Sequence, residues 1–296
     1  MIFEPDAPEP RRRRFRAIPV RLLLPNMITL LSLCAGLTAI RLALEGKIEW
    51  ALGAIVFAAA LDGIDGRVAR MLKGQSKFGA ELDSLADFLS FGVAPAILTY
   101  LWVLHDVRGI GWALAMLFAT CCALRLARFN TEREAADRPR WMHHFFTGIP
   151  APAAAGLALT PMIMSFVLGD DWTRNWLLNA VFVVFVAVMM VSRVPTFSIK
   201  RIRVKPEMVL PTLVLASAVI AGLVVESWLT LSIIALIYLF SIPFSVLSAR
   251  RMQRRELSAT TSAATPPATT APPTADAEPP SERVVTLGPP RQQRPG

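Results

Sequence analysis

The sequence predicts an all-α membrane protein, a polytopic bundle of about eight transmembrane helices whose N- and C-termini are both cytoplasmic. Three observations predict it. Hydrophobic residues make up 54% of the 296 residues, charged residues make up only 18%, and apolar stretches recur that are long enough to cross a bilayer core of about 30 Å. The predicted spans are Pro25–Leu44, Trp50–Arg70, Leu82–Leu104, Ile110–Phe129, Ile149–Leu168, Trp176–Val191, Met208–Val225 and Trp228–Leu247.

Individual residues indicate where some of the predicted spans begin and end. The first span begins at Pro25-Asn26, which also has the form of an ordinary helix start with a polar N-terminal cap. The second and third spans carry aspartates, which lower their hydropathy, and the polar turn Met71–Phe78 separates them. The other spans are placed by their apolar runs alone. We expect the second and third helices to form an antiparallel pair.

The distribution of basic residues predicts the orientation in the membrane. The 31 Lys and Arg residues fall in the terminal segments or around the loops that follow even-numbered spans, except for Arg41, Lys47, Arg108 and Arg174. Basic residues gather on the cytoplasmic side of membrane proteins, so both termini are predicted to be cytoplasmic. This pattern accounts for the net charge of +9 and favours contact with anionic membrane lipids. Because the charges are scattered over several segments, no nucleic-acid partner is expected.

Composition divides the chain into three segments. Residues 1–20 form a basic cytoplasmic N-terminal segment, and the apolar run after it has no small-residue cleavage site, so no cleaved signal peptide is expected. Residues 21–250 form the transmembrane domain. Residues 256–296 are rich in Ala, Thr and Pro and lack periodicity, which is typical of a disordered tail. The chemistry is therefore expected within the transmembrane domain.

Four aspartates lie in the second and third predicted spans: Asp62, Asp65, Asp83 and Asp87. The first two are three residues apart and the last two are four apart, so each pair occupies one face of its helix. Ionised carboxylates at membrane depth are costly and rarely unpaired. Ligands that are all oxygen favour Mg²⁺ or Mn²⁺, with Ca²⁺ as an alternative, over zinc. One or two such ions suit chemistry on a phosphate ester or anhydride.

Small and basic residues accompany the aspartates. Gly66 and Ala69 continue the face of the first pair and let a ligand approach the backbone, while Arg70 can neutralise a polyphosphate. The full pattern over Asp62–Asp87 is D-x-x-D-G-x-x-A-R-x8-G-x3-D-x3-D. It resembles the signature of the CDP-alcohol phosphatidyltransferase family at every fixed position.

Four further segments resemble one branch of that family, the membrane-integral phosphatidylserine synthases: Pro25–Thr29, Ser90–Pro95, Arg125–Asn130 and Phe146–Pro152. The resemblance implies metal-dependent transfer of the phosphatidyl group from CDP-diacylglycerol to the hydroxyl of L-serine, which gives phosphatidylserine and CMP. It also implies a homodimer. The enzyme would be a multi-pass protein of the inner (cytoplasmic) membrane, with its active site near the cytoplasmic face.

The resemblance implies roles for individual residues. All four aspartates would coordinate a pair of divalent ions, and Asp83 and Asp87 would be catalytic, with Asp87 as the general base. The donor CDP-diacylglycerol would be bound by residues of the first two helices, namely Asn26, Thr29, Asp62, Gly66, Ala69 and Arg70.

The acceptor alcohol is indicated by basic residues at the end of the fourth span. Serine carries a carboxylate, for which an arginine fork is a natural complement. Arg125 and Arg128, with Asn130 beside them, lie at the cytoplasmic end of the fourth span and are the predicted serine-binding residues. Glycerol 3-phosphate or inositol phosphate stay open as acceptors within the family. Outside it, an intramembrane prenyltransferase would place its aspartate motifs far apart, and a divalent-cation transporter would need an acidic site near mid-membrane.

Overall fold

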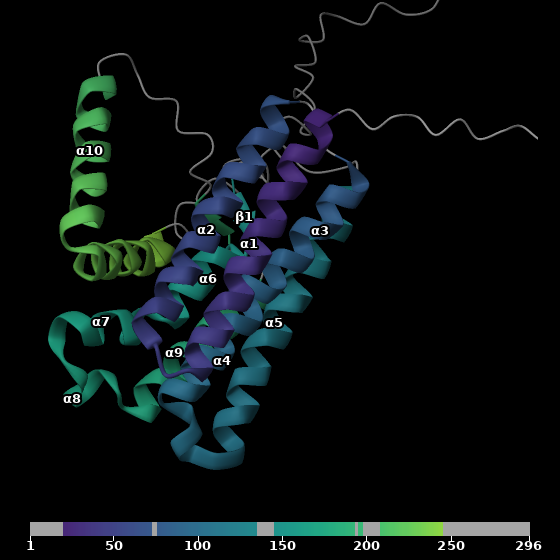
Figure 1. The fold of residues 1–296 in the computed structure, drawn as a ribbon. Helices are drawn as coiled ribbons and strands as arrows, with labels where there is room; N and C mark the ends of the chain where they lie inside the picture. The colour runs from purple at the N-terminus through teal and green to yellow at the C-terminus, as the bar shows by residue number, and fades with distance from the viewer. Residues whose placement is uncertain (1–19, 73–75, 135–144, 193–194, 198–207, 245–296) are drawn as a thin grey trace, which may run out of the picture. The chain divides into compact units, whose positions relative to one another are not determined.

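The protein is described here by a computed structural model that covers residues 20–72, 76–134, 145–192, 195–197 and 208–244 (Figure 1). This part of the chain is almost entirely helical. Its first half contains α1 (Val20–Leu44), α2 (Ile48–Met71), α3 (Lys77–Asp87), the π-helical η1 (Phe88–Val93), α4 (Ala94–Trp102), the 3₁₀ turn η2 (Leu104–Val107) and α5 (Arg108–Glu134). Its second half contains α6 (Ala151–Ala158), α7 (Thr160–Leu168), α8 (Asp170–Thr173), α9 (Trp176–Val191), α10 (Val209–Val225) and a last helix over Ser227–Phe244.

Several of these helices are long and apolar enough to cross a membrane. Within the described residues four qualify: Leu23–Leu44, Lys77–Trp102, Leu104–Thr131 and Ser227–Phe244. The pair α6 and α7, which is bent by 43° where Pro161 interrupts the backbone hydrogen bonding, raises the number to five if it forms one span. The protein is thus a multi-pass helical membrane protein, as predicted. The N-terminal segment and the tail predicted from composition lie outside the described residues.

The prediction of eight spans is not confirmed. Every predicted span coincides with a helical segment. Three of these segments are either too short or too rich in charged residues to count as membrane spans by length and composition. α2 fails because it carries Glu49 together with the aspartates and arginines of the motif, and α9 and α10 are apolar but shorter. Hydropathy alone treats a short apolar helix and a full span alike, so the number of crossings stays a prediction.

A short β-ladder is the departure from an all-α fold within the described chain. β1 (Phe145–Thr147) and β2 (Pro195–Phe197) pair antiparallel, with the Cα of Phe146 opposite that of Thr196. The ladder joins the segment after α5 to the segment after α9. Because each strand has three residues, the fold class is unchanged.

Helix α1 packs against both helices that carry the aspartates, α2 and α3. It packs along α2 and also contacts α3, η1 and α4, whereas α2 and α3 barely contact each other in the part of the chain that the structure describes. Small buried residues such as Ala39 and Ala58 allow the close approach of α1 and α2, and the Ser32 hydroxyl donates to the Ala58 carbonyl at 3.0 Å. The predicted third span, Leu82–Leu104, therefore contacts α2 mainly through η1 and α4, while α1 packs against both α2 and α3.

The packing of α1 against η1 depends on Gly36. Ser90 in η1 is completely buried, and its hydroxyl donates to the Ser32 carbonyl at 3.2 Å. A Cβ atom on Gly36 would lie 2.9 Å from the Cα of Ser90 and would also collide with its Oγ. The two backbones can approach this closely only because the α1 position carries no side chain.

We predict that Gly36→Ala lowers the free energy of unfolding by about 1–3 kcal/mol, since overpacking forces the backbones apart. A thermal melt of the purified protein in detergent measures the effect. The matched control is Gly53→Ala on α2, where a Cβ would meet nothing within 4 Å. That change should be neutral or slightly stabilising, because alanine favours the helix. Equal melting temperatures for the two variants would contradict the packing argument.

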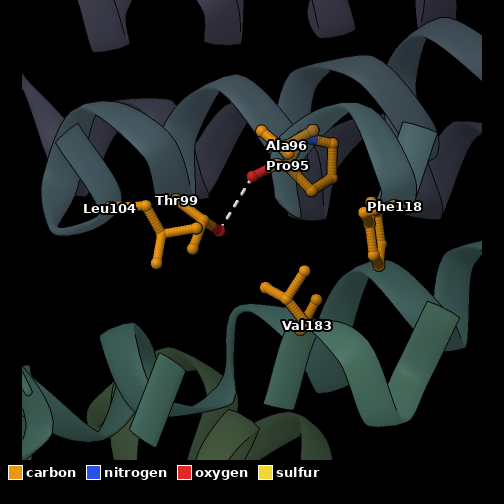
Figure 2. A pocket seen from close by; sticks show the side chains of 8 residues that line it. Pro95, Ala96, Thr99, Leu104, Phe118 and Val183 are labelled. Atoms are coloured by element: carbon orange, nitrogen blue, oxygen red, sulfur yellow. Dashed lines mark hydrogen bonds between the residues drawn. The ribbon is translucent and has the colours of Figure 1, made fainter. Parts of the chain in front are cut away.

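An apolar cavity lies away from the aspartates, between α4, α5, α6 and α9 (Figure 2). It is lined by Pro95, Ala96, Thr99, Leu104, Ala115, Phe118, Ala158 and Val183. The Thr99 hydroxyl already donates to the Pro95 carbonyl at 2.9 Å. The space is too finely divided to admit a water molecule. It is an imperfection of core packing.

Candidate metal and substrate site

Three aspartates converge between α2 and α3. One carboxylate oxygen from each of Asp62, Asp83 and Asp87 lies within 4.8 Å of the other two, and all three side chains are partly buried. Asp62 comes from α2, whereas Asp83 lies one turn before Asp87, the last residue of α3. The helical spacing predicted this convergence. Three carboxylate oxygens at this separation fit a hard divalent cation, which would relieve their mutual repulsion.

The chain changes helix type directly after Asp87. α3 ends there, and the π-helical η1 follows, a feature that is frequent at functional sites. The wider turn directs Ser90 toward α1 and places Gly92 against α5, where an added Cβ would lie 3.1 Å from the Sγ of Cys122. Ser90–Pro95 stood out in the sequence by its resemblance to the family, but the π-helical backbone over Phe88–Val93 was not predicted. Pro95, which cannot donate a backbone hydrogen bond, is the signal in the sequence that points to it.

Asp65, the fourth predicted metal ligand, lies outside the group of three. Its side chain is only 4% exposed, and it accepts a hydrogen bond of 2.8 Å from the Thr29 hydroxyl. The same hydroxyl lies 3.1 Å from the carbonyl of Pro25, one turn earlier in α1. Thr29, predicted as a donor-binding residue, is therefore placed to orient a carboxylate of α2.

The remaining residues predicted to bind the donor lie near the start of α1 and the end of α2. Asn26 lies against α3, because a Cβ on Gly79 would be 2.8 Å from its Oδ1 atom. On α2 the Arg70 guanidinium lies beside Gly66, where a Cβ would be 3.7 Å from Nη1. Ala69 is half-buried and Arg70 is exposed. Small residues and a cation thus lie one helical turn beyond the carboxylates, as the motif predicted.

Arg125, from α5, lies beside the aspartates. Its guanidinium is close enough to Asp87 and Asp62 to interact with them electrostatically. Its Nε atom is buried and has no hydrogen-bond partner among the described residues. Buried donors in folded proteins nearly always have a partner, so this N–H is available to an acceptor group that enters the site.

Arg128 and Asn130, the other predicted serine-binding residues, have partners within the protein. The Arg128 Nη1 atom donates to the carbonyl of Val191 at the end of α9, at 3.2 Å. The Asn130 amide donates to the Ser84 hydroxyl on α3 at 2.9 Å. These hydrogen bonds join α5 to α9 and to α3. The structure therefore brings Arg125 to the carboxylates, while serine binding by the other two residues stays a prediction.

The fold is that of a multi-pass helical membrane protein, and its three converging carboxylates form a group that could hold a metal ion. A family model described as CDP-alcohol phosphatidyltransferase matches residues 22–191, and a second, CDP-alcohol phosphatidyltransferase 2, matches residues 207–243. The chain belongs to the CDP-alcohol phosphatidyltransferase family. The resemblance noted from the aspartate motif is confirmed.

Curated relatives are similar over most of the chain. The CDP-diacylglycerol–serine O-phosphatidyltransferase of Mycobacterium tuberculosis is 39% identical over 243 residues, which are 82% of this chain and 83% of that protein. The protein of the same name from Helicobacter pylori strain J99 is 38% identical over 185 residues, 61% of this chain and 74% of that protein. The archaetidylserine synthase of Methanothermobacter thermautotrophicus is 34% identical over 177 residues, 58% of this chain and 68% of that protein.

Proposed function

We propose that this chain is a phosphatidylserine synthase, which transfers the phosphatidyl group of CDP-diacylglycerol to the hydroxyl of L-serine and releases CMP. The observation that carries the proposal is the convergence of Asp62, Asp83 and Asp87 beside the buried, unpartnered Nε of Arg125. Relatives that cover most of the chain bear the name of this activity. The carboxylates suit transfer from a diphosphate, and the arginine suits an acceptor that carries a carboxylate.

We assign a divalent cation, Mg²⁺ or Mn²⁺ with Ca²⁺ as an alternative, to the oxygens of Asp62, Asp83 and Asp87. When bound, such a cation neutralises the diphosphate and stabilises the charge that develops on the leaving CMP. A second cation, and Asp65 as a further ligand, also belong to the proposal. They rest on the family resemblance, since Asp65 has Thr29 as its partner here.

The residues of the chain supply the other steps. Asp87 accepts the proton of the serine hydroxyl as that oxygen attacks the β-phosphorus of the donor. Arg70, beside Gly66, offsets the charge of the diphosphate, and Ala69 leaves room for the nucleotide to approach the backbone. Arg125 donates to the carboxylate of serine and so orients its hydroxyl toward the reacting phosphorus.

The placement in the membrane is part of the same proposal. We propose eight spans in the inner membrane, with both termini and the site on the cytoplasmic side, where the Lys and Arg residues gather. At that face soluble serine meets a donor held by its acyl chains in the bilayer. A homodimer is proposed from the family resemblance.

The proposal is tested by CMP release from the purified protein with CDP-diacylglycerol and Mg²⁺ or Mn²⁺. L-Serine, glycerol 3-phosphate, inositol and inositol phosphate are compared in parallel as acceptors. We expect CMP release when L-serine is the acceptor and none with the other three compounds. Addition of EDTA should abolish the release. Release with another alcohol would keep the family and the carboxylate site but overturn the acceptor. Metal flux across vesicles without release of CMP would favour a transporter.

A further inference from the structure

Two buried side-chain atoms, one on α5 and one on the last helix, have no hydrogen-bond partner among the described residues. The Nε atom of Arg125 and the phenolic oxygen of Tyr238 are both inaccessible to solvent, and neither has a hydrogen-bond partner in the described part of the chain. The two side chains are close enough to interact electrostatically, although they come from α5 and from the last helix, Ser227–Phe244. One orphaned polar atom can reflect imperfect packing. Two on side chains that interact electrostatically from different helices point to a group that binds both.

The chemistry of the pair defines that group. The guanidinium offers only N–H donors and carries a positive charge, and the phenol offers an O–H donor. A group that satisfies both donors must accept two hydrogen bonds, and the charge of Arg125 selects an anion. A carboxylate has two acceptor oxygens and fits this requirement.

The position of the pair beside the aspartates restricts the ligand further. Arg125 also interacts with Asp87 and Asp62, so an anion held by the pair lies next to the proposed reacting centre. In serine only two carbon atoms separate the carboxylate carbon from the hydroxyl oxygen. A carboxylate bound to Arg125 therefore leaves the hydroxyl near Asp87.

We propose that Tyr238 is a specificity-determining residue whose hydroxyl, together with the Nε of Arg125, holds the carboxylate of the amino-acid acceptor. This inference rests on the proposed function and deepens it, because it assigns part of the acceptor pocket to the last helix. Tyr238 lies outside residues 22–191, which the first family model matches, and inside residues 207–243, which the second matches.

Two contacts fix the last helix in the position that this role requires. The indole Nε1 of Trp228 donates to the Glu49 carboxylate at the start of α2, at 3.0 Å. The Trp228 ring also stacks on Phe166 of α7, with ring centroids 5.0 Å apart. Both contacts are made in the first turn of the helix, and Tyr238 lies further along it. The helix is thus anchored to α2 and α7 before it reaches Arg125.

The test is Tyr238→Phe in the full chain, which removes only the hydroxyl. We expect the KM for L-serine to rise about 10- to 100-fold, the loss expected for one hydrogen bond to a charged group. The KM for CDP-diacylglycerol and the melting temperature should stay close to those of the unchanged protein. The matched control is Tyr100→Phe, which alters the other of the two tyrosines. Tyr100 packs edge-on against Trp112, with ring centroids 5.2 Å apart, and its change should leave both KM values unaltered.

A second measurement reads binding without turnover. With Mg²⁺ or Mn²⁺ and with CMP in place of CDP-diacylglycerol, so that no phosphatidyl group can be transferred, L-serine should raise the melting temperature of the unchanged protein, and Tyr238→Phe should reduce this rise. An unchanged KM and an unchanged rise would overturn the inference, as would a lowered melting temperature with equal effects on both substrates. If the unchanged protein releases no CMP with serine, the proposed function itself fails. A serine-dependent enzyme that tolerates Tyr238→Phe refutes only the role of Tyr238.

Discussion

Replacement of Asp83 by asparagine is expected to abolish turnover, with a fall in kcat of about 1,000-fold or more, while the protein stays folded. Asp83 contributes one of the three converging carboxylate oxygens. Asparagine has nearly the same shape but is neutral, so it weakens the cation site without disturbing the packing. The lost stabilisation of the transition state amounts to several kcal/mol, which corresponds to this fall in rate.

Asp83→Asn should raise the stability of the protein when no cation is bound, although it abolishes turnover. Without a cation the three carboxylates repel each other, so removal of one charge should raise the melting temperature in EDTA. The additional rise on adding Mg²⁺ or Mn²⁺ should shrink, because the altered site binds the ion less tightly. Glu81→Gln, an exposed change on the same helix, is the matched control and should alter neither quantity. Normal turnover by Asp83→Asn would refute the assignment of the metal site.

Replacement of Arg125 by methionine is expected to raise the KM for L-serine by about 30-fold or more. Loss of one partner from a buried, charged hydrogen bond costs about 2–5 kcal/mol. Methionine keeps much of the length of the side chain but removes its charge and its donors. The KM for CDP-diacylglycerol should change much less. Initial rates of CMP release, measured while each substrate is varied in turn, separate the two effects.

Substitutions of two other arginines, Arg41 and Arg128, serve as comparisons for Arg125→Met. Arg41→Met alters an exposed residue that pairs with Glu45 at 2.8 Å, and it should leave both KM values unchanged. Arg128→Met removes the hydrogen bond to Val191, and a matching rise in the serine KM would show that both arginines serve the acceptor. If Arg125→Met instead raised the KM for CDP-diacylglycerol, the residue would be reassigned to the phosphate of the donor.

The helix faces on which the aspartates lie could be predicted from the sequence because they depend on helical periodicity. Spacings of three and four residues put Asp62, Asp83 and Asp87 on defined faces, and the polar turn between the helices sets them antiparallel. Periodicity does not say which helix lies opposite a face. For this reason the pairing of Asp65 with Thr29 and the partner of Asn130 on α3 were not foreseen.

The features that could not be predicted all involve segments far apart in the chain or an irregular backbone. α1 packs against both α2 and α3, and this packing depends on small residues whose partners cannot be read from a single sequence. The π-helical turn after Asp87 depends on how η1 fits against α1 and α5. Tyr238 was overlooked because one tyrosine in an apolar helix carries no pattern. Its significance comes only from its closeness to Arg125.

The groups proposed to act on the two substrates come from different helices. The carboxylates and the small residues near the diphosphate belong to α2 and α3, whereas Arg125 belongs to α5 and Tyr238 to the last helix. A protein built in this way can exchange one alcohol for another by substitutions on two helices, while its transfer chemistry is inherited intact. The same separation makes α5 and the last helix the natural place to install a new acceptor by directed evolution.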